Sequence, residues 1–282
     1  MGLRINTNVP ALIAQRNLRN TRTNLDTTLE RLSSGLRINN AGDDAAGLAL
    51  SESLRAELRG LGQAERNAQD GISLVQIAEG ALGEVSNILI RMRELAVQAS
   101  SDTVGPQERK FLDNEFQHLL EEIDRISQST KFNGVPLLNG TGSTFEVQIG
   151  TKNNPMVDRI KLFDAHGADV NVVALGINLA NIAEKPMAQN SLGALDNALN
   201  TVTAIRSEFG AMQNRLQSVI NNIMVSRENM ANANSRIRDA DVAVEATNLT
   251  RNQILMQSGI AVLGQANSTL KGALSLLQGG AG

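Results

Sequence analysis

Apolar side chains recur at intervals of three or four residues along two long stretches of the chain, residues 25–89 and 192–237. This spacing is the pattern of helices that pack lengthwise against other helices. Neither stretch contains a proline. We therefore predict a mainly α fold, in which long helices from both ends of the chain form a coiled-coil-like rod. The first series begins with Leu25, Leu29, Leu32 and Leu36.

A break interrupts the first series at residues 39–44, where asparagine and glycine are typical of a helix end. Asp43 or Asp44 is suited to cap the next helix, which we expect to run from 44 to 101. A shorter helix is expected after Pro106, because Leu112, Phe116 and Leu119 share one face. We expect a turn at 131–134 to end it.

The middle of the chain has a different pattern. Residues 144–150 alternate between apolar and polar side chains, as a half-buried strand does. Residues 157–163 and 170–175 show the same tendency more weakly. We predict a small β-hairpin and irregular region over 141–188, flanked by helices.

The C-terminal segment, residues 246–282, carries only two charged side chains, Arg251 and Lys271. A water-exposed helix normally carries more charge on its outer face. The segment therefore fits a helix surrounded by protein, and a frayed tail is the alternative. Its apolar series includes Leu255, Val262, Leu270, Leu274 and Leu277.

The composition excludes several classes of function. The 26 basic and 29 acidic side chains give a net charge of −3, which favours neither a nucleic-acid interface nor binding to an anionic membrane. No cysteine is present to form a disulfide or a thiolate site. We expect no membrane span and no secretory signal of the cleaved type. With aromatic residues at 2%, small and aliphatic side chains must fill the core.

Residue types with catalytic potential are sparse. The only histidines are His118 and His166, and His118 is expected on a helix surface. Gly60 and Gly62 lie within a helical pattern and lack the strand that precedes a nucleotide-binding loop. The neighbouring acids Glu121 and Glu122 fit a solvated helix face. We therefore expect neither an enzyme nor a cofactor.

Five motifs in order resemble bacterial flagellins. They are LSSGLRINNAGDDAAGLA at 32–49, DGISLVQ at 70–76, RMRELAVQ at 91–98, FNG at 132–134 and SRIRDAD at 235–241. The resemblance covers roughly residues 1–150 and 188–278. The stretch 141–188 is short compared with the large variable domains of many flagellins. A short form that builds a thin, smooth filament is implied.

The resemblance implies a structural, self-assembling subunit of an extracellular flagellar filament. It places an inner coiled-coil domain at 1–43 with 240–282, and a helical rod domain at 44–239. The leucines of 25–36 and the C-terminal apolar series would then serve inner-domain assembly. Export through the flagellar type III apparatus is implied, with an export chaperone at the C-terminal segment and with cap and hook-associated proteins as further partners.

The resemblance also implies recognition by Toll-like receptor 5 of an animal host. Arg91, Leu95 and Glu115 match the central residues of the receptor-binding patch. Because Arg91 and Leu95 are four residues apart, we expect them to share a helix face as an arginine and an apolar anchor. The same patch is expected to serve packing between rods. Two alternatives stay open for the whole chain, a hook-filament junction protein and a secreted coiled-coil effector or adhesin.

Overall fold

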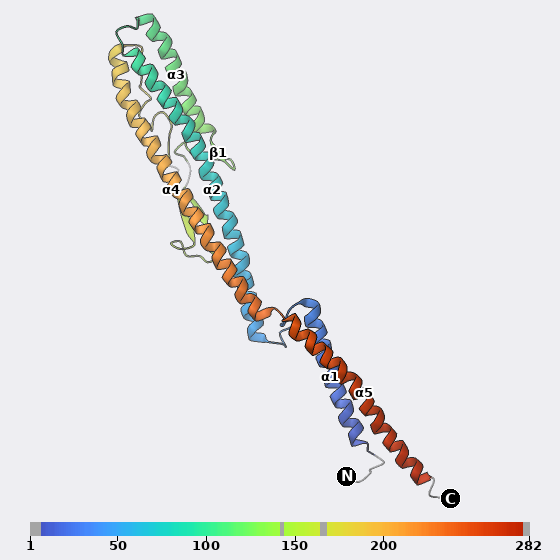
Figure 1. Cartoon of the computed structure of the whole chain (residues 1–282). Helices are drawn as coiled ribbons and strands as arrows, with labels where there is room; N and C mark the ends of the chain where they lie inside the picture. The colour runs from blue at the N-terminus through green and yellow to red at the C-terminus, as the bar shows by residue number, and fades with distance from the viewer. Residues whose placement is uncertain (1–6, 142–143, 164–167, 279–282) are drawn as a thin grey trace. The chain divides into compact units, whose positions relative to one another are not determined.

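The computed structural model describes residues 7–141, 144–163 and 168–278. Helices dominate these residues, and two short antiparallel sheets complete the regular structure, which confirms the predicted mainly α class. The chain divides into two compact units, residues 1–56 with 229–282 (unit 1) and residues 57–228 (unit 2). The helices are α1 (Val9–Ser34), α2 (Ala45–Ala99), α3 (Pro106–Ser129), α4 (Lys185–Arg238) and α5 (Val242–Gln278) (Figure 1).

In unit 1, α1 and α5 lie side by side in opposite directions (Figure 1). The side chain of Asn8 caps α1 by accepting a hydrogen bond from the backbone N–H of Ala11 at 3.1 Å. At the other end, Gly35 adopts a left-handed conformation with φ of 72°, and its N–H donates to the carbonyl of Arg31. These local signals fix the length of α1.

Two connections meet in unit 1, the one that follows α1 and the one that precedes α5. Leu36 and Asp239 form an antiparallel bridge, and the N–H of Ala240 donates to the carbonyl of Gly35 at 2.9 Å. The carboxylate of Asp44 accepts from the N–H of Gly47 at 2.8 Å and caps α2. The predicted break at 39–44 and the predicted aspartate cap are thus confirmed.

In unit 2, α2 and α4 run antiparallel and α3 packs beside them (Figure 1). Polar pairs mark the alignment: Arg93 Nε donates to Asp196 Oδ1 at 2.7 Å, and Gln213 donates to Glu79 at 2.9 Å. The predicted helical series supplies the interior. Its buried members include Val75, Leu82 and Leu89 on α2, Phe116 and Ile123 on α3, and Leu195, Val202, Phe209 and Leu216 on α4.

The β structure of unit 2 consists of two hairpins. Strand β3 (Phe145–Gln148) pairs with β4 (Arg159–Phe163), as the alternating pattern predicts. The first hairpin, β1 (Lys131–Phe132) with β2 (Val135–Pro136), was expected only as a turn. At this turn Asn133 and Gly134 have φ values of 48° and 81°, a conformation that glycine and asparagine tolerate best.

The prediction of a strand at 170–175 is wrong. The side chain of Asn171 accepts a hydrogen bond from the N–H of Ala174 at 2.7 Å, and the N–H of Leu175 donates to the carbonyl of Asn171. Such local bonds compete with a sheet ladder and favour turns. The apolar side chains Val170 and Leu175 are nevertheless buried, which explains the misleading pattern.

Candidate assembly and recognition surfaces

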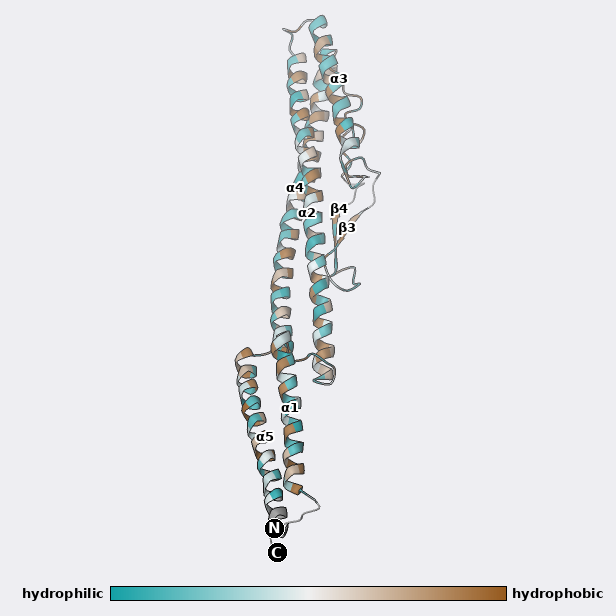
Figure 2. Cartoon of the chain, turned by 90° about the vertical axis from the view of Figure 1, so that its right-hand side faces the viewer, coloured by the Kyte–Doolittle hydropathy of each residue, from teal (hydrophilic) through white to brown (hydrophobic). Residues whose placement is uncertain are grey.

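Large apolar side chains stay exposed along both helices of unit 1. Figure 2 shows hydrophobic positions (brown) along α1 and α5. A pair of helices buries one stripe of each partner and leaves the remaining faces open. Monomeric proteins rarely expose extended apolar surface, so such surface marks an interaction site. Nine of these side chains are 46% to 59% exposed: Val9, Leu12, Ile13 and Leu29 on α1, and Val244, Ile254, Leu255, Ile260 and Val262 on α5.

Some of the predicted inner-domain residues are half-buried within unit 1, and others are exposed. Leu25, Leu32 and Leu36 are half-buried within unit 1. Leu29 is 47% exposed and belongs, with Leu255 and Val262, to the open surface. The side chains of Leu270, Leu274 and Leu277 lie outside the described residues. Participation of the whole set in assembly stays a prediction.

Polar contacts fix how α1 and α5 pair. Arg31 Nη1 lies 3.2 Å from Glu245 Oε1, and the glutamate side chain is only 10% exposed. At the far end of α1, the side-chain amide of Asn8 donates to the carbonyl of Ala266 at 3.1 Å. Sequence reasoning missed these residues. A signal was available, since Glu245 is the only acidic residue between 242 and 278.

On unit 2, the structure brings two of the three predicted recognition residues together. The guanidinium of Arg91, on α2, donates to Glu115 Oε1, on α3, from Nε at 3.0 Å and from Nη2 at 2.9 Å. A further bond reaches Glu94 at 3.0 Å. Hydrogen bonds to Glu115 and Glu94 raise the pKa of Arg91. All three side chains are about half exposed, so this charged cluster is accessible.

The third residue, Leu95, does not belong to this exposed cluster. The expectation that Arg91 and Leu95 together present an arginine and an apolar anchor is therefore wrong. The side chain of Leu95 is 1% exposed and belongs to the core shared by α2, α3 and α4. Residues four apart on a helix differ by about 40° in direction. Arg91 and Leu95 therefore lie on either side of the boundary between the exposed and the buried face of α2.

Apolar surface does occur close to Arg91. Ile90 and Val97 on α2 are 46% and 51% exposed. They line a shallow hollow together with Arg93, Glu94 and Gln98. The apolar component of a recognition patch is thus supplied by these two residues, which the sequence reasoning overlooked because it followed the buried series.

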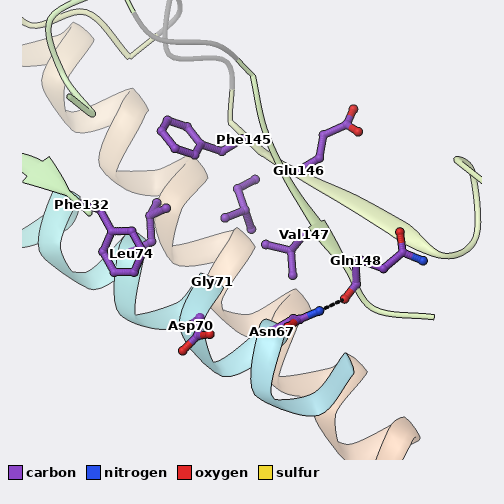
Figure 3. A pocket seen from close by; sticks show the side chains of 10 residues that line it. Asn67, Asp70, Gly71, Leu74, Phe132, Phe145, Glu146, Val147 and Gln148 are labelled. Carbon is purple, nitrogen blue, oxygen red and sulfur yellow. Dashed lines mark hydrogen bonds between the residues drawn. The ribbon is translucent and has the colours of Figure 1, made fainter. Parts of the chain in front are cut away.

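A second hollow, of about 360 Å³, lies between α2 and the β3–β4 hairpin (Figure 3). Its lining is largely apolar and includes Leu74, Phe145 and Val147. Asn67 Nδ2 donates to the carbonyl of Gln148 at 3.0 Å and ties the hairpin to the helix (Figure 3). We treat this hollow as part of the packing of the β3–β4 hairpin against α2.

Other residues weighed in the sequence occupy structural positions. His118 is 79% exposed, as predicted, and pairs with Glu121 at 3.3 Å. Gly60 and Gly62 lie inside α2. His166 falls outside the described residues. Within the part of the chain that the structure describes, no cluster of three metal-ligating side chains occurs, and no helix is both long and apolar enough to traverse a membrane.

Comparison with known proteins decides the family. The model of the bacterial flagellin N-terminal helical region matches residues 5–143, and that of the C-terminal helical region matches residues 192–277. The chain belongs to the bacterial flagellin family. A flagellin of Halalkalibacterium halodurans is 46% identical over 97% of this chain and 99% of its own. The flagellar filament 33 kDa core protein of Treponema phagedenis is 41% identical over the same shares.

A solved structure agrees with the family. The crystal structure of Bacillus cereus flagellin, 34% identical, matches 60% of this chain and 94% of its own with a TM-score of 0.50. The chain is a short form of flagellin, because only residues 144–191 separate the two matched regions, too few for a large variable domain. Flagellins are structural proteins of the extracellular flagellar filament, and they polymerise with copies of themselves.

Proposed function

We propose that this flagellin polymerises mainly through the apolar faces of α1 and α5 that unit 1 leaves uncovered. The observation that carries the proposal is the set of nine apolar side chains between 46% and 59% exposed on these two helices. Those on α5 lie where charged residues are few, since this helix contains only Glu245, Arg251 and Lys271. A face of this kind is stable when another protein surface covers it.

The energetic argument supports contact between many copies. Complete burial of a large aliphatic side chain contributes about 1.5–3 kcal/mol, so covering a side chain that is half exposed contributes roughly 1 kcal/mol. Nine such side chains together supply about 9 kcal/mol per copy. This lies within the range estimated for the entropy lost on association, about 4–15 kcal/mol. Assembly therefore needs several contacts per subunit, as a helical polymer provides.

Seeded polymerisation of the purified full-length chain tests this function. We expect filaments by electron microscopy when fragments of filament are added. The variant Ile254→Gln/Ile260→Gln/Val262→Gln should polymerise poorly, because three polar amides replace apolar contacts. The control Met156→Gln/Val173→Gln/Leu179→Gln replaces three apolar residues of unit 2 that are 70% to 94% exposed, and it should polymerise normally. A wild-type chain that stays monomeric with seeds, or a variant that matches its control, would refute the proposal.

Family membership also suggests which segments form the inner domain and which form the rod. We propose that 1–43 with 240–282 forms the inner domain and 44–239 the rod, with 141–188 as its β-hairpin and irregular part. Export through the flagellar type III apparatus without a cleaved signal, binding of an export chaperone to the C-terminal segment, and contacts with cap and hook-associated proteins belong to the same proposal. The seeded polymerisation above also distinguishes the junction-protein alternative, since a junction protein would not elongate the filament fragments.

Recognition by Toll-like receptor 5 is a second proposed role. It rests on the accessible cluster of Arg91, Glu94 and Glu115 and on the exposed Ile90 and Val97 beside it. An exposed arginine beside apolar side chains is a typical hot spot of a protein interface. In the filament we propose that this surface contributes to packing between rods, so that receptor binding requires the monomer.

A further inference from the structure

Three arginines form an exposed row on α1. Arg16, Arg19 and Arg22 follow one another at intervals of three residues, which places them beside one another on the helix surface. Among the residues that the structure describes, no carboxylate lies within ion-pair distance of them. The row contrasts with the ion-paired Arg31 further along α1. Its charge is thus available to another molecule.

The row belongs to a longer zone of one sign. Residues 7–25 and 246–278 contain five positive side chains and no negative one. The rest of unit 1, residues 26–56 and 229–245, contains eight negative and five positive side chains, a net charge of −3. We call these segments the basic zone and the acidic zone. The basic zone consists of Arg16, Arg19, Arg22, Arg251 and Lys271.

The pairing of α1 with α5 keeps the two zones apart in space. Asn8 contacts Ala266 near one end of the pair, and Arg31 contacts Glu245 near the other. The uncharged and basic parts of both helices are therefore side by side, and so are the acidic parts. Unit 1 carries a separation of charge along its helices.

Exposed carboxylates are available in the acidic zone. Asp26 and Asp239 are exposed, and so is Glu30, which accepts one hydrogen bond from Asn40 at 3.0 Å. The distance along α1 from Arg19 to Glu30 is eleven residues, or about 17 Å at 1.5 Å per residue. That exceeds the Debye length of about 8 Å at physiological ionic strength, so Arg16 and Arg19 act on a neighbour separately from Glu30, whereas Arg22 and Asp26, about 6 Å apart along the helix, adjoin where the zones meet.

Two copies packed at equal height through α1 and α5 would place basic zone against basic zone. We propose that, within the axial stagger of a helical polymer, the arginine row of one copy packs against the acidic zone of the next and thereby sets the register between neighbouring copies. This inference rests on the proposed assembly through unit 1 and names the second copy as the occupant of the arginine row. The apolar faces supply most of the association energy, and the charges select the register.

A charge-swap experiment tests the stagger. Variant A, Arg16→Glu/Arg19→Glu/Arg22→Glu, makes both zones acidic. Variant B, Asp26→Lys/Glu30→Lys/Asp239→Lys, makes the acidic zone basic. Each exposed pair contributes little alone, but replacing three attractions by repulsions should raise the critical concentration for seeded polymerisation at least about 10-fold for either variant. An equimolar mixture should polymerise within about 3-fold of wild type, because A and B then present opposite charges to each other.

Three controls separate the possible outcomes. The control Arg59→Glu/Lys110→Glu/Arg215→Glu makes the same change of net charge as variant A, but on exposed residues of unit 2, and it should leave polymerisation unchanged. Circular dichroism must show that A and B retain wild-type helix content, and Arg16→Gln/Arg19→Gln/Arg22→Gln provides a milder test if A does not fold. Failure of wild type to polymerise would overturn the proposed function. Normal wild-type polymerisation with no rescue in the mixture, or with no defect in A and B, would overturn the stagger alone.

Discussion

Arg31 on α1 and Glu245 on α5 form an ion pair at 3.2 Å, 214 positions apart in the sequence. The pair joins the last turn of α1 to the first turn of α5, close to the bridge between Leu36 and Asp239. Two segments from opposite ends of the sequence are thereby aligned before any second copy is present. The open faces of α1 and α5 are then presented in a fixed register for assembly.

Removing one partner of this pair should destabilise unit 1. In Arg31→Ala the carboxylate of Glu245, 10% exposed, loses its partner, and we expect a loss of about 2–4 kcal/mol in unfolding free energy. Glu245→Gln leaves the unpaired charge on Arg31, whose side chain is 29% exposed, and should be milder. Urea unfolding followed by circular dichroism at 222 nm measures both. Equal stability of Arg31→Ala and wild type would show that the pair does not hold the two helices.

Gly71 on α2 allows the β3–β4 hairpin to approach the helix. A Cβ atom at this position would lie 3.1 Å from Cγ2 of Val147. Gly71→Ala should therefore gain less than the roughly 1 kcal/mol that alanine contributes over glycine within a helix. Gly80 is the matched control, because nothing lies within 4 Å of its added Cβ. Gly80→Ala should raise the thermal midpoint, and an equal rise in Gly71→Ala would contradict the close approach.

The recognition surface is best tested without touching the core. Because Leu95 is buried, Leu95→Ala would create a cavity costing about 2–5 kcal/mol and confuse binding with stability. We expect Arg91→Ala and Glu115→Ala each to weaken Toll-like receptor 5 signalling by monomeric protein about 10-fold, the range of an interface hot spot. Arg125→Ala, which removes the exposed pair with Glu122 on α3, is the control. Undiminished signalling by Arg91→Ala would contradict a role of this surface in receptor recognition.

Acid should loosen the connection between α1 and α2. Backbone N–H groups of Asn40 and Asn39 donate to the carboxylate of Asp43 and lower its pKa. A lowered folded pKa contributes stability that is present above the unfolded value, near 3.9, and is lost as pH falls through the folded value. Asp43→Asn should therefore lower the unfolding free energy of unit 1 at pH 7. Near pH 3 the unfolding free energies of Asp43→Asn and wild type should differ less. A difference independent of pH would contradict this role of Asp43.

The long helices were predictable because their signals are repetitive. Proline-free stretches with apolar residues every three to four positions give α2 and α4, and Asp44 marks the start of α2. The short β1–β2 hairpin was not predictable in this way, since strands of two residues carry no alternation. At 170–175 the side-chain hydrogen bonds of Asn171 outweighed the apolar pattern.

The recognition site was only partly predictable for a different reason. Family motifs located Arg91 and Glu115, whose contact joins α2 to α3. Spacing of four residues could not establish whether Leu95 faces solvent, because the boundary of the buried face falls between it and Arg91. The depth of a side chain at such a boundary depends on the neighbouring helices, which one helical pattern does not describe.

Hydrogen exchange by mass spectrometry, on monomer and on polymerised protein, tests the central claim most directly. Backbone amides of a helix gain protection when its open faces are covered and local opening becomes unfavourable. We predict that α1 and α5 gain the most protection on polymerisation, and that residues 57–228 change less. Assembly through α1 and α5 would be contradicted if residues 57–228 gained the most protection on polymerisation while α1 and α5 exchanged as fast in the filament as in the monomer.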